Sequence, residues 1–167
     1  MKQMKTCAER PLLNLEVPKE GLTVELMLQP QEQVGREPQY WPLFNAGNES
    51  EEEYFGNWNI DIQSGGVLTL KVTLDLSKVP GRNLEFVRYR QNHKLDGLIA
   101  LTPDFRHQFR ARAKEVDGEY TTLIIKIKDK EEISDRFSFL WMCVDAETGM
   151  HFVSGDPDAA INPIPIS

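Results

Sequence analysis

The feature that most constrains this chain is the alternation of apolar and polar residues over short segments, with turn signals recurring about every ten residues. The clearest example is the segment 67–76, where leucine or valine stands at every even position and mostly threonine, lysine or aspartate at the odd ones. A two-residue period places alternate side chains on opposite faces, so this pattern predicts a strand with one buried face. No segment shows sustained helical periodicity with capping residues. The chain is therefore predicted to be all-β.

A second segment, 137–157, predicts a hairpin at the centre of a sheet. Its first half has apolar side chains on both alternating sets, with Phe137, Phe139, Trp141 and Cys143 on one and Leu140, Met142 and Val144 on the other. Such a strand is expected to be covered on two sides. Turn residues at 145–149 lead into a returning strand at 150–154, which ends in Gly155-Asp156-Pro157.

These patterns predict an antiparallel, immunoglobulin-like β-sandwich of about seven to nine strands. With 167 residues, 40% of them apolar, the chain can bury a core without disulfides or a metal. Residues 1–20 are polar and are expected to be extended or disordered, so a single sandwich domain is predicted for 21–167. A long acidic and aromatic loop is expected at 30–57. Because proline cannot donate to a ladder, the proline-containing segment 158–166 is expected at a sheet edge or extended.

Charge and cysteine content limit the setting and the partners. The net charge of −7 argues against non-specific binding of nucleic acid, which depends on Lys and Arg neutralising phosphates. Cys7 in a polar segment and Cys143 in an apolar strand make a poor disulfide framework and favour a reduced cytoplasm. We expect neither export nor a membrane span, because the first residues carry no apolar run followed by a small-residue cleavage site and no run of about 18 apolar residues occurs. We expect no cofactor and no metal, since the histidines have no ligand spacing.

The segment 105–128 predicts a hairpin with one apolar and one basic face. A three-residue loop at 116–118, with Gly118 in the left-handed conformation, would pair Ala111 with Leu123 and Phe109 with Ile125. That register buries the apolar sides together. It leaves a basic stripe on the opposite surface, made of Arg106, Arg110, Arg112, Lys114, Lys126 and Lys128.

The basic stripe has two interpretations. It binds an unknown protein partner or mediates self-association, or it is a solvated outer face that discourages edge pairing. Nucleic acid is disfavoured because base stacking needs aromatic residues among the cations, and this face offers only Tyr120 and Ile124. The long loop holds a second candidate: Tyr40, Trp41 and Phe44 form a partner-binding patch, or the segment folds back and plugs one end of the sandwich.

The Asp156-Pro157 bond is the candidate for chemistry. An aspartate side chain can attack its own carbonyl carbon and close a five-membered ring, with the proline nitrogen as leaving group. A rigid turn after a hairpin could hold the bond in the required geometry. The alternative is ordinary turn chemistry, which Gly-Asp-Pro also fits.

The hairpin strands Phe137–Leu140 and Phe152–Ser154, followed by Asp156-Pro157, resemble the DP-EP family of small bacterial β-sandwich proteins, over the C-terminal part of the chain only. That family includes members that cleave themselves at an Asp-Pro bond. The resemblance implies Asp156 as the reacting carboxylate, Pro157 as the leaving residue and Asp158 as a helper. We therefore expect a cytoplasmic bacterial β-sandwich of unknown function that cleaves itself at this bond, or alternatively a non-catalytic protein-interaction or structural module.

Overall fold

The computed structural model describes residues 13–32, 41–45, 57–88, 95–100, 109–128, 135–154 and 158–164. These ranges contain twelve strands: β1 (Leu13–Val17), β2 (Leu22–Leu28), β3 (Leu43–Asn45), β4 (Asn57–Gln63), β5 (Val67–Leu74), β6 (Leu84–Phe86), β7 (Leu98–Ala100), β8 (Phe109–Val116), β9 (Glu119–Lys128), β10 (Asp135–Asp145), β11 (His151–Val153) and β12 (Asp158–Ile164). No helix occurs within them, so the predicted all-β class is confirmed for the described chain. The same ranges hold no helix of the length and hydropathy that a bilayer crossing needs.

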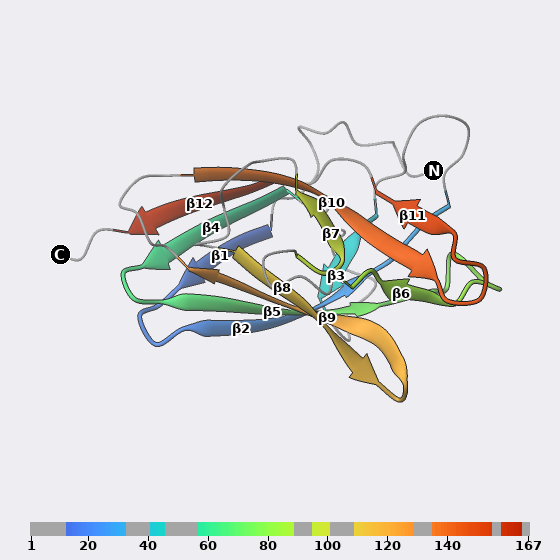
Figure 1. Ribbon diagram of the computed structural model, residues 1–167. Helices are drawn as coiled ribbons and strands as arrows, with labels where there is room; N and C mark the ends of the chain where they lie inside the picture. The colour runs from blue at the N-terminus through green and yellow to red at the C-terminus, as the bar shows by residue number, and fades with distance from the viewer. Residues whose placement is uncertain are drawn as a thin grey trace.

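The strands form two sheets that pack face to face around one core (Figure 1). The seven-stranded sheet has the order β1-β4-β12-β10-β11, with β6 and β7 also paired to β10. The five-stranded sheet has the order β3-β2-β5-β9-β8. Inward-facing side chains of both sheets, such as Ile60 and Phe139 from one and Leu70 and Ile125 from the other, are fully buried. The two-residue period of the sequence therefore locates the core correctly.

Two tight corners join the sheets and explain a departure from the predicted antiparallel sandwich. Residues 18–21 connect β1 to β2, and residues 64–66 connect β4 to β5, each corner crossing from the larger sheet to the smaller. Because β1 pairs in parallel with β4 and β2 in parallel with β5, the corners lie side by side. β12 also pairs in parallel with β4. The described chain is thus a mixed β structure of twelve strands, which does not bear out seven to nine antiparallel, immunoglobulin-like strands.

The two corners approach each other closely at Gly66. A Cβ atom at this position would stand 2.5 Å from the carbonyl oxygen of Pro18, which is too close for any side chain. The backbone N–H of Lys19 donates to Oε1 of Gln63 at 3.2 Å, which ties the corners together. The stacking of the corners therefore depends on glycine at 66.

β10 is the central strand of the larger sheet, as predicted. It forms antiparallel ladders with β6, β7, β11 and β12. Its inward set carries aromatic rings. The ring centroids of Phe137 and Phe109 of β8 are 4.4 Å apart, and those of Phe139 and Trp58 of β4 are 5.2 Å apart. The alternate set is only half-buried, so the predicted covering on two sides is partial.

The β8–β9 hairpin has the predicted faces but a different turn. Asp117 and Gly118 both have positive φ, 53° and 83°, which is the geometry of a two-residue hairpin turn. Ala111 pairs with Ile125, two residues beyond the predicted partner. The register changes between the pairs Val116–Glu119 and Lys114–Thr122, where β9 carries one residue more than β8, and this bulge in β9 brings the apolar faces back into phase. The predicted three-residue loop is therefore wrong.

Segments expected to be irregular contribute strands. Leu13–Val17 forms β1 within the polar lead-in, and Leu43–Asn45 forms β3 within the long loop. β12 lies between β4 and β10, so its expected place at an edge is wrong. Its ladder with β10 covers only 158–161, whereas its ladder with β4 continues to Ile164. Pro163 thus stands beyond the stretch that is paired on both sides, where a missing N–H is tolerated.

Candidate functional site: a basic sheet face

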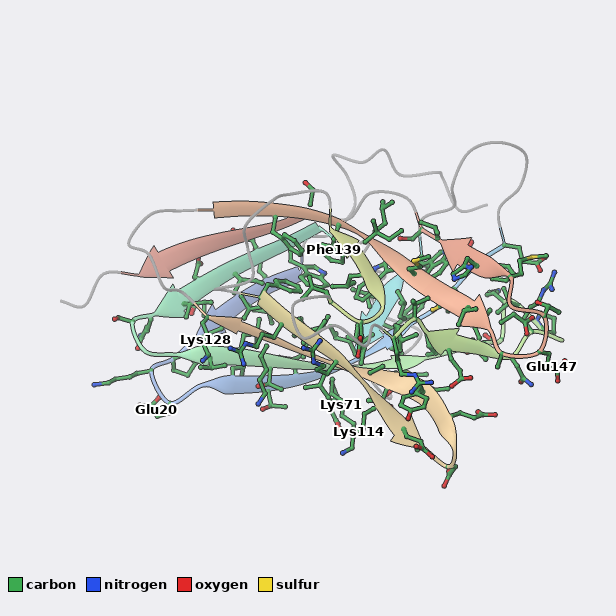
Figure 2. All side chains as sticks on the ribbon, viewed as in Figure 1. Glu20, Lys71, Lys114, Lys128, Phe139 and Glu147 are labelled. Atoms are coloured by element: carbon green, nitrogen blue, oxygen red, sulfur yellow. The ribbon has the colours of Figure 1, made fainter. Side chains whose placement is uncertain are left out.

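The outer surface of the five-stranded sheet is the strongest candidate for a functional site. Five exposed cations alternate along β8 and β9 and are named here the basic face: Arg110, Arg112, Lys114, Lys126 and Lys128. Figure 2 shows Lys114, with Lys71 of β5, projecting on the side opposite the buried Phe139. The predicted outward orientation is confirmed for these five, and Arg106 lies outside the described residues.

The strand register places part of the basic face in one row across four strands. Thr23 of β2 lies beside Thr69 of β5, Thr69 beside Lys126 of β9, and Lys126 beside Arg110 of β8. Arg110 and Lys126 are therefore like charges directly opposite each other, an arrangement that destabilises a sheet. Among the described residues, neither has a carboxylate within salt-bridge distance.

The neighbouring row shows a contrasting pattern. Glu25 of β2 lies beside Lys71 of β5, and their side chains form a salt bridge at 3.7 Å. An opposite-charge pair directly across two strands stabilises a sheet. In the row of Thr23 and Thr69, hydroxyl groups stand where a carboxylate would neutralise the cations, so this part of the basic face stays positively charged.

A hollow of about 580 Å³ opens where the basic face meets the two corners. Its walls include the four residues of the row, together with Lys128 of β9 and Lys19 and Glu20 of the first corner. Its lining therefore holds four cations and one carboxylate. Figure 2 shows Lys128 and Glu20 toward the same end of the sheet, away from Lys114. The hollow is a concave site with a net positive lining.

Asp96 covers the outer edge of β8. Its backbone N–H donates to the carbonyl oxygen of Ala111 at 3.1 Å, and its Oδ2 accepts from the N–H of Ala113 at 2.9 Å. These groups of β8 are then unavailable to a further strand. The adjoining Gly97 has φ of 71°, and a Cβ there would stand 2.8 Å from the Phe86 ring. Asp96 and Gly97 therefore form a buried turn that caps the edge of β8.

A second polar cluster surrounds Arg82. Its Nε donates to Oε1 of Glu32 at 3.1 Å, and its Nη1 lies 3.6 Å from Oδ2 of Asp145. Its guanidinium also lies 5.2 Å from the centroid of the Phe152 ring. Asp145 is almost fully buried, and its Oδ1 accepts from the N–H of Glu147 at 2.9 Å. Because both carboxylates already have partners, we interpret this cluster as a brace between segments.

Of the remaining predicted site residues, those that the structure describes belong to segments other than β8 and β9. Asp156, Pro157 and Tyr40 lie outside the described residues. Asp158 begins β12, where its backbone pairs with β10 and β4. Trp41 and Phe44 are only 2% and 5% exposed, so they have little surface to offer a partner. Their burial fits the alternative in which this segment folds back onto the sandwich.

The residues that complete the hollow were not predicted from the sequence. Alternation indicated that Thr69 and Lys126 point outward, but it carries no information about which strands are neighbours. Thr23 reaches the hollow because β2 pairs in parallel with β5, which in turn pairs with β9. Lys19 reaches it through the first corner. Nothing in the local sequence around Thr23 or Lys19 indicates that these residues line the hollow.

The fold and this surface define an all-β protein of mixed sheets with a cationic outer face. No family model matches the chain, and no curated protein matches it. Among solved structures, the chain is similar to the crystal structure of the inclusion body protein PixA from Burkholderia cenocepacia J2315. The TM-score is 0.39 and the identity 10%, over 88% of this chain and 96% of that chain.

These comparisons correct the suggested family. The resemblance to the DP-EP family is wrong, because no family model, that of this family included, matches the chain. The motif that suggested it is short, and Gly-Asp-Pro is ordinary turn chemistry. The roles that the resemblance implied for Asp156, Pro157 and Asp158 lose that support.

Proposed function

We propose that this protein is a non-catalytic interaction module that binds an acidic protein segment through the basic face. The observation that carries the proposal is the gathering of five exposed cations on one side of one sheet, in a chain with a net charge of −7. Complementary charge steers an acidic partner toward such a surface and fixes its orientation.

The competing interpretation, a solvated face that only discourages edge pairing, explains less. Asp96 already occupies backbone groups of the β8 edge at Ala111 and Ala113. Edge protection also gives no reason for Arg110 to lie opposite Lys126, because like charges in that position destabilise the sheet. An anionic partner does supply a reason, since it neutralises both.

A nucleic acid partner is also less favoured than an acidic protein. Binding of single strands uses exposed aromatic rings on which bases stack. Tyr120 is the aromatic residue that the sequence places on this surface, and its ring lies under the guanidinium of Arg88, 3.5 Å from the centroid. At least one face of that ring is therefore already occupied.

A peptide with the sequence of residues 46–56, which contains four glutamates, is a suitable probe. In fluorescence anisotropy, the labelled peptide should bind saturably at about 20 mM NaCl and lose affinity as salt rises to about 500 mM, because salt screens surface charges. Lys114→Glu should weaken binding about fivefold. Lys78→Glu makes the same charge change at an exposed turn residue outside the basic face and should have a much smaller effect. Salt-independent binding, or equal losses in the two variants, would contradict the proposal.

A further inference from the structure

We infer that the hollow beside the two corners is a binding site for a phosphomonoester group carried by the acidic partner. This inference rests on the proposed function of the basic face and assigns the hollow a narrower chemistry. Its starting point is the row of Thr23, Thr69, Lys126 and Arg110, which ends in two cations side by side, with no carboxylate of the described residues within salt-bridge distance of either.

The donors around the hollow suit a phosphate dianion better than single carboxylates. Arg110 offers a planar fork of N–H groups, which matches two oxygens of a phosphate. Lys126 and Lys128 add point charges from β9, and the hydroxyl of Thr69 is a neutral donor on the neighbouring strand. Adjacent strands lie about 4.8 Å apart, so donors on β5, β9 and β8 span about 10 Å. Flexible lysine and arginine side chains can converge on one group across that distance.

The first corner supplies another side of the site. Lys19 adds a cation from that corner, and the neighbouring Glu20 is the carboxylate of the lining, which leaves a net excess of three positive charges (four minus one). Gly21 allows the corner to approach β5, since a Cβ there would stand 3.1 Å from the carbonyl oxygen of Val67. With Gly66 packed on Pro18, this wall is formed by backbone in close contact. A wall of this kind is preorganised for a ligand.

The size of the hollow indicates a phosphate that is attached to something larger. Its volume of about 580 Å³ lies within the range of small-molecule sites, roughly 300–1,000 Å³, and exceeds what a lone phosphate fills. The hollow also adjoins the basic face, so a phosphorylated residue could enter it while flanking acidic residues lie along β8. A doubly charged group between Arg110 and Lys126 would relieve their repulsion.

The test uses three forms of the 46–56 peptide, with serine, phosphoserine or glutamate at the position of Ser50. With the full-length protein, the phosphoserine form should bind about tenfold more tightly than the glutamate form, because a dianion can accept bidentate hydrogen bonds and several charges at once. Arg110→Ser and Lys126→Thr should each abolish that difference. Lys114→Glu should weaken all three peptides and keep the difference, and Lys78→Glu should change neither.

A last experiment uses inorganic phosphate alone, to distinguish free phosphate from a phosphate group attached to a partner. If it protects against thermal unfolding more than chloride at equal ionic strength and displaces the phosphopeptide with equal affinity, the site takes free phosphate, which overturns a partner-borne group. If the phosphoserine and glutamate peptides bind equally, the inference fails while the proposed function stands. If no peptide binds, both fail. Should Arg110→Ser or Lys126→Thr not fold, Lys128→Ser at the end of β9 and Lys19→Ser in the first corner test the same site from other positions.

Discussion

Asp75, the residue after β5, shows how one carboxylate fastens the ends of two paired strands. Its Oδ2 accepts from Nε2 of Gln29 at 3.1 Å, its Oδ1 accepts from the N–H of Ser77 at 3.0 Å, and its own N–H donates to the Leu28 carbonyl at 2.8 Å. Burial raises the pKa of Asp75, but the hydrogen bonds from Ser77 and Gln29 and the charge of Lys78 outweigh it. The pKa therefore lies below its ordinary value of 3.8.

Asp75→Asn should lower the free energy of unfolding at pH 7, with a deficit that shrinks in acid. A carboxyl whose folded pKa is depressed stabilises the protein above its unfolded pKa, and this contribution is lost as pH falls through the folded pKa. The difference from the parent protein should thus decline below pH 3.8. Urea unfolding between pH 7 and pH 3 measures it, with Asp117→Asn in the exposed hairpin turn as a charge-matched control. A deficit that stays constant over this range would show that the hydrogen-bonded charge is not responsible.

Among elements, the two stacked corners depart most from what the sequence indicated. The register sets Asn14, Leu15, Glu16 and Val17 beside Asn59, Ile60, Asp61 and Ile62, residues of matching type at four successive positions. This similarity covers only four residues. The pairs in β1 and β4 are 45 residues apart (59 − 14), whereas those in β2 and β5 are 46 apart (68 − 22), so the similarity does not continue in one alignment of the sequence. Parallel pairing of like corners places both outward faces on one surface, which creates the hollow.

Gly66→Ala should destabilise the protein more than Gly65→Ala. At 65 a Cβ meets nothing within 4 Å, and the penalty is the positive φ of 86°, about 1 kcal/mol. At 66 the Cβ would collide with backbone of the other corner, so the corners must separate at a penalty of about 3 kcal/mol. Thermal unfolding of both variants decides the order. Equal stabilities would mean that the corners are not in the contact described.

The alternation of apolar and polar residues predicts which face of a strand each side chain occupies, but not which strands are neighbours. It assigned Arg110 outward and Ala111 inward correctly, because a two-residue period fixes faces. It could not assign neighbours: the bulge in β9, the parallel corners and the place of β12 depend on contacts between paired segments. Trp41 was ambiguous for the same reason, since a loop aromatic is either exposed or a plug until its neighbours are known.

At the scale of the whole molecule, the Asp156-Pro157 bond gives a direct test of the non-catalytic proposal. The nearest ladder residues before and after this bond are Val153 and Asp158, which pair with Met142 and Ser138 of β10. If this peptide bond were broken, β11 and β12 would both stay paired with β10. The two fragments would therefore remain together in the folded protein, and only denaturation would separate them. Denaturing intact-mass analysis after days at mildly acidic pH should give one full-length mass. Two fragments that split after Asp156 and disappear in Asp156→Asn would show self-cleavage instead.

The place of β12 also bears on how the molecule is made. Its partner Asn57 precedes Asp158 by 101 residues (158 − 57), and β12 is the strand that joins β4 to β10. In a nascent chain, β4 must wait with an open edge until this late segment is synthesised. Such delayed, non-local pairing slows folding and exposes intermediates to aggregation. Chaperone assistance during synthesis would protect that vulnerable interval.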